Sequence, residues 1–262
     1  MALHVLDEAN RCLGCKKPMC QQGCPIHTNI PEVIRLLKDN HLDDAGRMLF
    51  ENNPLTTVCS LVCNHENQCE GHCIRNRMPS HDPVHFSIIE DYISTTYANK
   101  MTSGPAPRNG MKAAVVGSGP AGLTCAGDLA KKGYEVSIFE ALHTAGGVLV
   151  YGIPEFRLPK AIVANEVKKL EAMGVHVMTD MVIGKVLSID ELFEEMGFKA
   201  VFVGSGAGLP MFMHIPGENL CGVYSANEFL TRINLMKAYK DGSDTPIMPL
   251  AGKRVAVVGG GN

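Results

Sequence analysis

The sequence predicts an α-helical, cysteine-rich N-terminal unit followed by an α/β unit of the Rossmann-like kind. Two observations carry this prediction. Eight of the ten cysteines fall between Cys12 and Cys73. Residues 113–140 then read as a strand, a glycine-rich turn, a helix and a second strand, which is the opening of a nucleotide-binding βαβ unit. A further strand and glycine-rich turn at residues 254–262 predict the start of a second unit of the same kind.

The N-terminal unit, residues 1–100, contains three segments with helical periodicity and cysteine-rich loops between them. Helices are predicted over 31–40, with Thr28 or Asn29 as cap, over 42–52, which Pro54 follows, and over 84–98. Residues 101–111 contain two prolines and two glycines without periodicity, so we expect a linker there.

The glycine-rich turn has the residues that a dinucleotide site needs. It reads Gly117, Ser118, Gly119, Pro120, Ala121 and Gly122. Gly117 permits the tight turn, Gly119 lets the backbone approach a pyrophosphate, and Gly122 lets the helix pack on the strand. Glu140 ends the second strand, where a carboxylate accepts hydrogen bonds from ribose hydroxyls. A βαβ turn without a nucleotide is the alternative, since glycine-rich turns also occur for backbone reasons alone.

The remainder of the chain continues the α/β pattern. Helices are expected over 160–173, 189–196 and 225–239, strands over 175–178 and 200–203, and a buried strand over 254–258. We take residues 112–245 as one incomplete nucleotide-binding domain and 246–262 as the first strand and turn of the next. The chain is therefore expected to belong to a longer protein, with a natural short form as the alternative, and to be inactive alone.

Bulk composition excludes several classes of partner. The net charge of −3 gives no reason to expect nucleic acid or an anionic membrane. The first residues contain acids and no apolar run, so they do not form a signal peptide, and glycines and prolines interrupt the uncharged stretch 200–217. We expect a cytoplasmic protein with no membrane span.

The cysteines form two closely spaced groups. The first is Cys12, Cys15, Cys20 and Cys24, with Pro25 after it, and the second is Cys59, Cys63, Cys69 and Cys73. Such spacing favours iron–sulfur clusters, and a fourth cysteine followed by proline typically reaches to a second cluster. Structural zinc, with His27, His65 or His72 as extra ligands, is one alternative, and disulfides, which need an exporting context, are the other. Cys125 and Cys221 are isolated and are expected to be ordinary packed residues.

The double cysteine frame, VVGSGPAGL, GGVLVYGIPEFRLPK, IPGENLCGV and VVGGGN together resemble the glutamate synthase small (beta) subunit family. That family is related to a subunit of ferredoxin:NADP oxidoreductase and to the N-terminal half of dihydropyrimidine dehydrogenase. The resemblance covers essentially the whole chain. It implies two [4Fe–4S] clusters in the helical domain, an FAD domain, and an NADPH- or NADH-binding domain inserted into the FAD domain.

The resemblance also implies the ligands of the two clusters. Cys12, Cys15, Cys20 and Cys73 match one set, and Cys24, Cys63 and Cys69 match three members of the other. Its fourth ligand in the relatives is Gln or Glu, and Glu90 falls at that position. A solvated helix acid is the alternative for Glu90, and Cys59 matches no ligand.

For FAD, the resemblance places the pyrophosphate at Gly117, Gly119, Ala121 and Gly122 and the ribose at Glu140. It places weaker contacts at Gly147, Val182, Gly206 and Ala207. Gly259, Gly261 and Asn262 would open the NAD(P)H site.

The resemblance implies an oxidoreductase that passes electrons from NAD(P)H through FAD and the clusters to a partner. The expected partner is a large glutamate synthase-type subunit. Alternatives are a ferredoxin-like electron acceptor, a dihydropyrimidine dehydrogenase subunit, and a zinc-stapled, nucleotide-binding interaction module without catalysis. No catalytic acid or base is expected, because the cofactors supply the chemistry.

Overall fold

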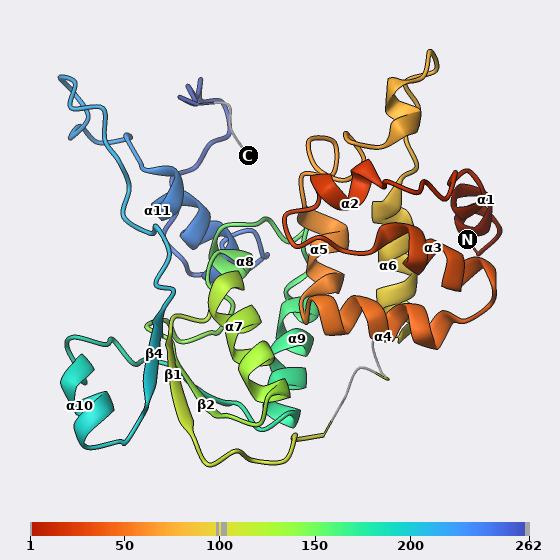
Figure 1. Ribbon diagram of the computed structural model, residues 1–262. Helices are drawn as coiled ribbons and strands as arrows, with labels where there is room; N and C mark the ends of the chain where they lie inside the picture. The colour runs from red at the N-terminus through yellow and green to blue at the C-terminus, as the bar shows by residue number, and fades with distance from the viewer. Residues whose placement is uncertain (1, 98–99, 101–103, 260–262) are drawn as a thin grey trace.

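A computed structural model describes residues 2–97, 100 and 104–259. Figure 1 shows a helical N-terminal unit beside an α/β unit. The helical unit contains six α-helices and one 3₁₀-helix within the described residues: α1 (Ala2–Asn10), α2 (Met19–Gly23), α3 (Ile30–Lys38), α4 (Leu42–Asn52), α5 (Thr56–Val62), η1 (Ile74–Arg77) and α6 (Phe86–Tyr97). The three predicted helices are present. However, α2 and α5 contain Cys20 and Cys59, so the segments between the predicted helices are not all loops.

The core of the helical unit follows from helical periodicity. In α3, Ile30, Val33, Ile34 and Leu37 are buried at the spacing that puts them on one face. Pro31 stands in the first turn, where its missing N–H costs nothing. This face packs with the buried side of α4 and α6 in one apolar cluster.

Two buried carboxylates hold the N-terminal end of α6. The Glu8 Oε1 atom accepts a hydrogen bond from the backbone N–H of His85 at 2.6 Å, and the Glu70 Oε1 atom accepts one from the N–H of Ser87 at 2.9 Å. Both acids are buried. Free N–H groups and the positive end of the helix dipole favour carboxylates at this position. The start of α6 is therefore fixed to α1 and to the cysteine-rich loop.

The α/β unit is built on a four-stranded parallel sheet with the order β3-β2-β1-β4. The strands are β1 (Lys112–Val116), β2 (Glu135–Phe139), β3 (His176–Met178) and β4 (Ala200–Val203). This order is that of the first half of a Rossmann-like sheet. All four strands were predicted, with bounds that differ by at most one residue.

Helices cover both faces of the sheet. Val115 and Ile138 belong to the apolar cluster formed with α7 (Pro120–Lys131) and α9 (Lys160–Ala172). Phe139 faces the other side, where its ring meets the Phe198 ring edge-on at 5.8 Å, near α10 (Ile189–Glu194). Neighbouring residues of a strand point to opposite faces, which explains why Ile138 and Phe139 lie in different clusters.

The two units share one apolar core. Phe50, Leu55 and Val58 of the helical unit are buried in the same cluster as Leu123 and Leu170 of α7 and α9. In Figure 1, α5 lies beside α9, in agreement with the contacts between these helices. The cysteine-rich unit is thus packed against the α/β unit and not merely tethered to it.

The C-terminal quarter differs from the prediction in three places. The short helix α8 (Val148–Tyr151) lies before this region. The helix expected over 225–239 is shorter than predicted: α11 (Ala226–Leu230) is followed by a π-helical turn, Thr231–Leu235, which ends it. Cys221 is exposed and not packed. Residues 254–258 form no strand and are exposed, with Val257 at 85%.

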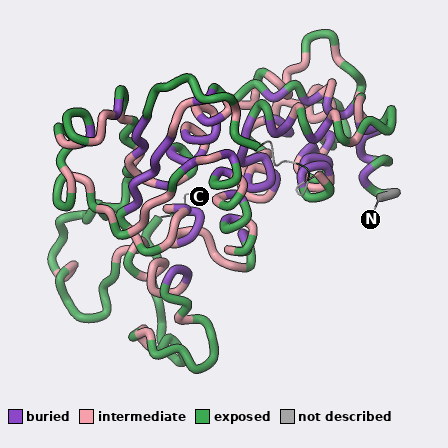
Figure 2. Tube along the Cα trace, turned by 90° about the horizontal axis from the view of Figure 1, so that it is seen from below, coloured by how far each residue is buried: buried purple, intermediate pink, exposed green. Residues whose placement is uncertain are grey.

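The error at 254–258 has a physical reason. An apolar strand becomes buried only when neighbouring strands and helices cover it, and no described strand lies beside this segment. Figure 2 shows long exposed stretches outside the two buried cores, in line with the mostly exposed residues 204–259. Gly259 is described and exposed, whereas Gly261 and Asn262 lie outside the described residues.

Candidate cofactor sites

The first predicted ligand set lines one pocket in the helical unit. Cys12 and Cys15 come from the loop after α1, Cys20 from α2, and Cys73 from the residue before η1. Burial, together with the neighbouring Cys73, Cys12 and Cys15 thiols, raises the pKa of the Cys20 thiol to about 11. The structure therefore brings together four thiols from three separate segments. Iron binding would displace their protons.

The second predicted set lies close to the first, because Cys69 also lines the pocket of the first set. Cys24 follows α2, Cys63 follows α5, and Cys69 is buried in the turn between Cys63 and η1. Burial raises the pKa of the Cys69 thiol, and Glu70, Glu90 and Cys24 also raise it through their negative charges. Cys24, Cys69, Glu70 and Glu90 are thus near neighbours, although Cys24 and Glu90 are 66 positions apart in the sequence.

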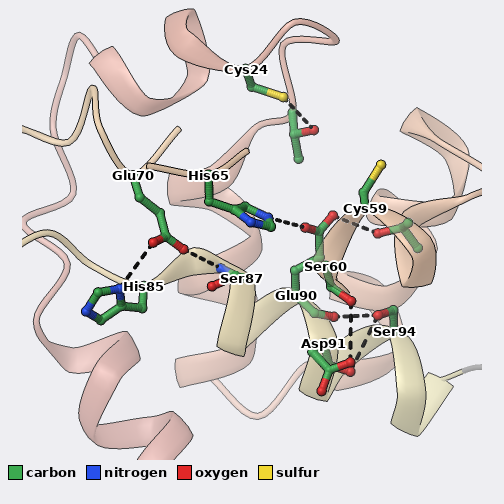
Figure 3. Close-up of polar contacts among 12 residues, drawn as sticks. Cys24, Cys59, Ser60, His65, Glu70, His85, Ser87, Glu90, Asp91 and Ser94 are labelled. Atoms are coloured by element: carbon green, nitrogen blue, oxygen red, sulfur yellow. Dashed lines mark hydrogen bonds and ion pairs between the residues drawn. The ribbon is translucent and has the colours of Figure 1, made fainter. Parts of the chain in front are cut away.

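Glu90 is buried in α6 and is 7% exposed. Its Oε1 atom accepts a hydrogen bond from the Thr56 hydroxyl at 2.9 Å, and its Oε2 atom lies 3.9 Å from the Nε2 atom of His65. Figure 3 shows His65 facing this carboxylate. The alternative of a solvated helix acid is therefore wrong. The role of Glu90 as an iron ligand stays a prediction.

Cys59 is the cysteine that the ligand sets leave over. Its sulfur accepts a hydrogen bond from the Asn53 side-chain amide at 3.0 Å. A hydrogen bond with Cys63 raises the pKa of Cys59 and lowers the pKa of Cys63. Cys59 therefore lies beside a predicted ligand.

The donors fit the chemistry of iron–sulfur clusters. Thiolates are the usual ligands, and both groups offer several cysteines within a largely apolar pocket or loop. In the part of the chain that the structure describes, no three His, Cys, Asp or Glu side chains are placed to hold a single metal ion. That finding concerns one ion, whereas the four ligands of a four-iron cluster bind four different iron atoms.

The glycine-rich turn joins β1 to α7 with the expected geometry. A Cβ atom on Gly122 would lie 1.9 Å from the backbone oxygen of Gly117, so only glycine fits there. A Cβ atom on Gly119 would meet no protein atom within 4 Å. Gly119 caps the N-terminus of α7, and Pro120 and Ala121 begin the helix. The open space at this helix end fits a phosphate group.

Ser118 links the turn to two other segments. Its backbone N–H and its hydroxyl both donate to Oε2 of Glu140, the former at 2.8 Å, and its hydroxyl accepts a hydrogen bond from the N–H of Gly146 at 2.9 Å. Oε1 of Glu140 accepts one hydrogen bond, from the N–H of Leu142 at 2.8 Å. This leaves Oε1 with capacity for a further donor such as a ribose hydroxyl.

The weaker predicted contacts lie around the same edge of the sheet. A Cβ atom on Gly147 would lie 2.7 Å from Cα of Gly119, so the two backbones touch. Val182 follows Met181, whose N–H donates to the backbone oxygen of Glu140 at 2.8 Å. Gly206 and Ala207 follow the end of β4. The carboxyl ends of parallel strands are where Rossmann-like sheets bind their ligands, and the structure places all of these residues there.

Sequence reasoning missed two residues at the second cysteine group. Thr56 is separated from Glu90 by 34 positions, and no spacing rule connects them. The sequence offers His65 only as an extra ligand of the alternative zinc site. The buried position of its Nε2 atom is a property of the fold that the sequence does not contain.

Residues 111–262, more than half of the chain, match the protein family described as pyridine nucleotide-disulphide oxidoreductase. The chain belongs to this family. Residues 2–102 match the family described as dihydropyrimidine dehydrogenase domain II, 4Fe-4S cluster. An iron–sulfur domain is therefore followed by a pyridine nucleotide-disulphide oxidoreductase domain.

Curated relatives of this oxidoreductase match nearly the whole chain. The glutamate synthase [NADPH] small chain of Azospirillum brasilense is 34% identical over 265 residues, which are 98% of this chain and 54% of the relative. The protein of the same name from Escherichia coli K12 is 32% identical over 260 residues, 97% of this chain and 54% of the relative. These matches confirm the resemblance to glutamate synthase small subunits.

A third relative is the NAD-dependent dihydropyrimidine dehydrogenase subunit PreT of Escherichia coli O157:H7. It is 34% identical over 216 residues, which are 81% of this chain and 52% of the relative. The chain thus spans about half the length of the curated relatives it matches. Among the described residues, no helix combines the length and the apolarity that a bilayer crossing requires.

Proposed function

We propose that this chain is the iron–sulfur and flavin-binding part of an NAD(P)H-dependent electron-transfer subunit, which serves a glutamate synthase-type large subunit. Bound FAD would take a hydride from NADPH or NADH, and two [4Fe–4S] clusters would pass single electrons onward. The protein's own contribution is to hold these groups at fixed positions and to tune them. In this role the partner would use the electrons to form glutamate from glutamine and 2-oxoglutarate.

The observation that carries the proposal is the gathering of Cys12, Cys15, Cys20 and Cys73 around one pocket. Four thiols at one point suit a thiolate-bound metal centre, and free thiols gathered there would be open to oxidation. The nucleotide turn, in a unit that shares an apolar core with the helical unit, supports the flavin part of the proposal. The match to a 4Fe-4S domain family agrees with the cluster part.

The second group, Cys24, Cys63, Cys69 and Glu90, would hold the cluster nearer to the flavin. Cys63 follows α5, and α5 contacts α9 of the α/β unit. In Figure 1, α1, which precedes Cys12 and Cys15 in the sequence, lies on the side of the helical unit away from α9. Electrons would therefore enter at the second cluster and leave from the first.

Two partners compete for this electron path. The large subunit of glutamate synthase agrees with the first two relatives, and a dihydropyrimidine dehydrogenase partner agrees with the PreT relative. Purification of the tagged natural subunit, followed by identification of the co-purified chain, separates them. A large subunit with an amidotransferase domain supports glutamate synthase, and a pyrimidine-reducing subunit overturns that assignment.

The cofactor part is tested by iron, sulfide, zinc and flavin analysis of the chain purified without oxygen, together with a visible spectrum. We expect about eight irons and eight sulfides per chain and a broad absorption that bleaches on reduction. Zinc without sulfide would overturn the electron-transfer function. The nucleotide fold would then stand alone as an interaction module.

A further inference from the structure

The two oxygens of Glu90 have unequal surroundings. Oε1 is engaged by the Thr56 hydroxyl at 2.9 Å. Oε2 has no hydrogen bond among the described residues, and its nearest ionic neighbour is Nε2 of His65 at 3.9 Å. That distance is too long for a hydrogen bond. Nε2 of His65 is itself buried without a hydrogen-bond partner in the described part of the chain.

One short segment supplies three of the groups beside this carboxylate. Thr56 begins α5, Cys63 follows its last residue, and His65 comes two residues later. The opposing helix α6 is fixed by the carboxylates that hold its N-terminal end. The position of Glu90 relative to the Cys63 sulfur is therefore set by residues 56–65 on one side and by the anchored helix on the other.

A buried carboxylate with so few partners is costly by itself. No described Lys or Arg lies within ion-pair distance of Glu90, and His65 is its one ionic neighbour there. Burying an ionised carboxylate requires a cation or several hydrogen bonds in compensation. An iron atom at the free oxygen would supply that compensation, because carboxylate oxygen is a hard donor that binds iron.

We propose that Thr56 and His65 are positioning residues for the second cluster. Thr56 engages Oε1 and so leaves Oε2 of Glu90 as the single oxygen available to iron. The Nε2 edge of His65 faces the same oxygen at 3.9 Å, and its N–H dipole stabilises the negative charge that reduction adds. Hydrogen bonds around cluster ligands are among the factors that set reduction potentials. This inference rests on the proposed function, because it needs a cluster at the second cysteine group.

Redox titration of the cluster-loaded 262-residue chain tests this inference. Thr56→Val removes the hydroxyl at nearly constant volume, and His65→Phe removes the N–H donor. Each variant is expected to shift the midpoint potential of one cluster to a more negative value, while the other cluster and the iron content stay as in the wild type. Thr56→Ser and His65→Gln keep a donor and should largely restore the wild-type potential.

Thr57 offers a matched control. It is the next residue in α5, it is buried, and its hydroxyl has no hydrogen-bond partner among the described residues. Thr57→Val makes the same chemical change in the same helical turn without touching Glu90. Both potentials should therefore remain at their wild-type values in this variant.

The outcomes separate the two proposals. A wild-type chain that contains zinc and no sulfide overturns the proposed function before any variant is made. A wild-type chain with two clusters whose potentials are unaffected by Thr56→Val and by His65→Phe overturns the positioning role alone. If Thr56→Val loses half of the iron, Thr56→Ser decides: retention with the wild-type potential supports the role of the hydroxyl, and equal loss in Thr56→Ser overturns it.

Discussion

Replacement of Ser118 by alanine tests whether this serine joins the nucleotide turn to the two segments beside it. The hydroxyl donates to the buried carboxylate of Glu140 and accepts from the buried N–H of Gly146. An unsatisfied buried donor costs about 1–3 kcal/mol, and a hydrogen bond to a charged group contributes about 1.5–3 kcal/mol. Because Glu140 keeps its bonds to the N–H groups of Ser118 and Leu142, the lower part of the summed range applies. We expect a loss of about 3 kcal/mol in the free energy of unfolding.

The assay is urea unfolding of the 262-residue chain, followed by a fluorescence titration with FAD. A loss of about 3 kcal/mol is a large part of the 5–15 kcal/mol that stabilises a typical domain. Flavin binding should weaken as well, since Gly146 precedes the Gly147 contact with Gly119. Ser205→Ala is the control, because Ser205 is exposed beside the same turn and makes no side-chain hydrogen bond within the described residues. If Ser118→Ala costs under 1 kcal/mol and binds FAD as well as Ser205→Ala does, the linking role of Ser118 is refuted.

Two further predictions concern a close contact and a buried charge. Gly122→Ala places a Cβ atom 1.9 Å from the backbone oxygen of Gly117, so the affinity for FAD should fall by roughly 10- to 100-fold. Gly208→Ala is the control, because a Cβ atom there meets nothing within 4 Å, and this variant should bind FAD normally. Equal affinities in the two variants would contradict the close-packing argument. Burial alone would raise the pKa of Glu8, but hydrogen bonds from Arg11 and a backbone amide outweigh it and hold that pKa below its ordinary value. Ionised Glu8 therefore stabilises the fold above about pH 4.5, and this contribution disappears as the pH falls through the lowered pKa. Glu8→Gln should lower the free energy of unfolding at pH 7 and flatten its decline toward pH 4. Urea unfolding of the wild type and the variant at several pH values measures both effects. If the two curves of unfolding free energy against pH run parallel, this account is contradicted.

Periodic elements could be predicted from the sequence because their burial is decided by their own residues. The helix over Leu42–Asn52 and the strand over Ala200–Val203 have the predicted bounds. By contrast, α5 was missed. It is seven residues long and buries Thr56, Thr57, Val58 and Ser60, so polar and apolar residues lie together on its buried side and no amphipathic pattern marks it.

The site could be predicted only as far as residue types and spacing carry it. Cysteine spacing grouped Cys12, Cys15 and Cys20, and the glycine spacing located the turn at Gly117–Gly122. The burial of Glu90 could not be obtained in this way, because it depends on Thr56 and His65 from a different helix and loop. The exposed segment 254–258 is the opposite case: its residues favour a strand, but its burial depends on neighbours that the described fold does not place beside it.

The helix α7 connects the nucleotide turn to the cysteine-rich unit in a single rigid piece. Its N-terminus follows the turn at Gly119, and near its C-terminus the Lys131 ammonium donates to the backbone oxygens of Phe50 and Glu51 at the end of α4, at 3.3 and 3.1 Å. A cation is favourable there because free carbonyls and the negative end of the helix dipole meet it. Gly127 lets Pro54 approach α7, since a Cβ atom would lie 3.0 Å from that proline ring. A helix of 12 residues is about 18 Å long. The separation between the glycine-rich turn and the segment that leads into α5 is therefore fixed by a regular helix.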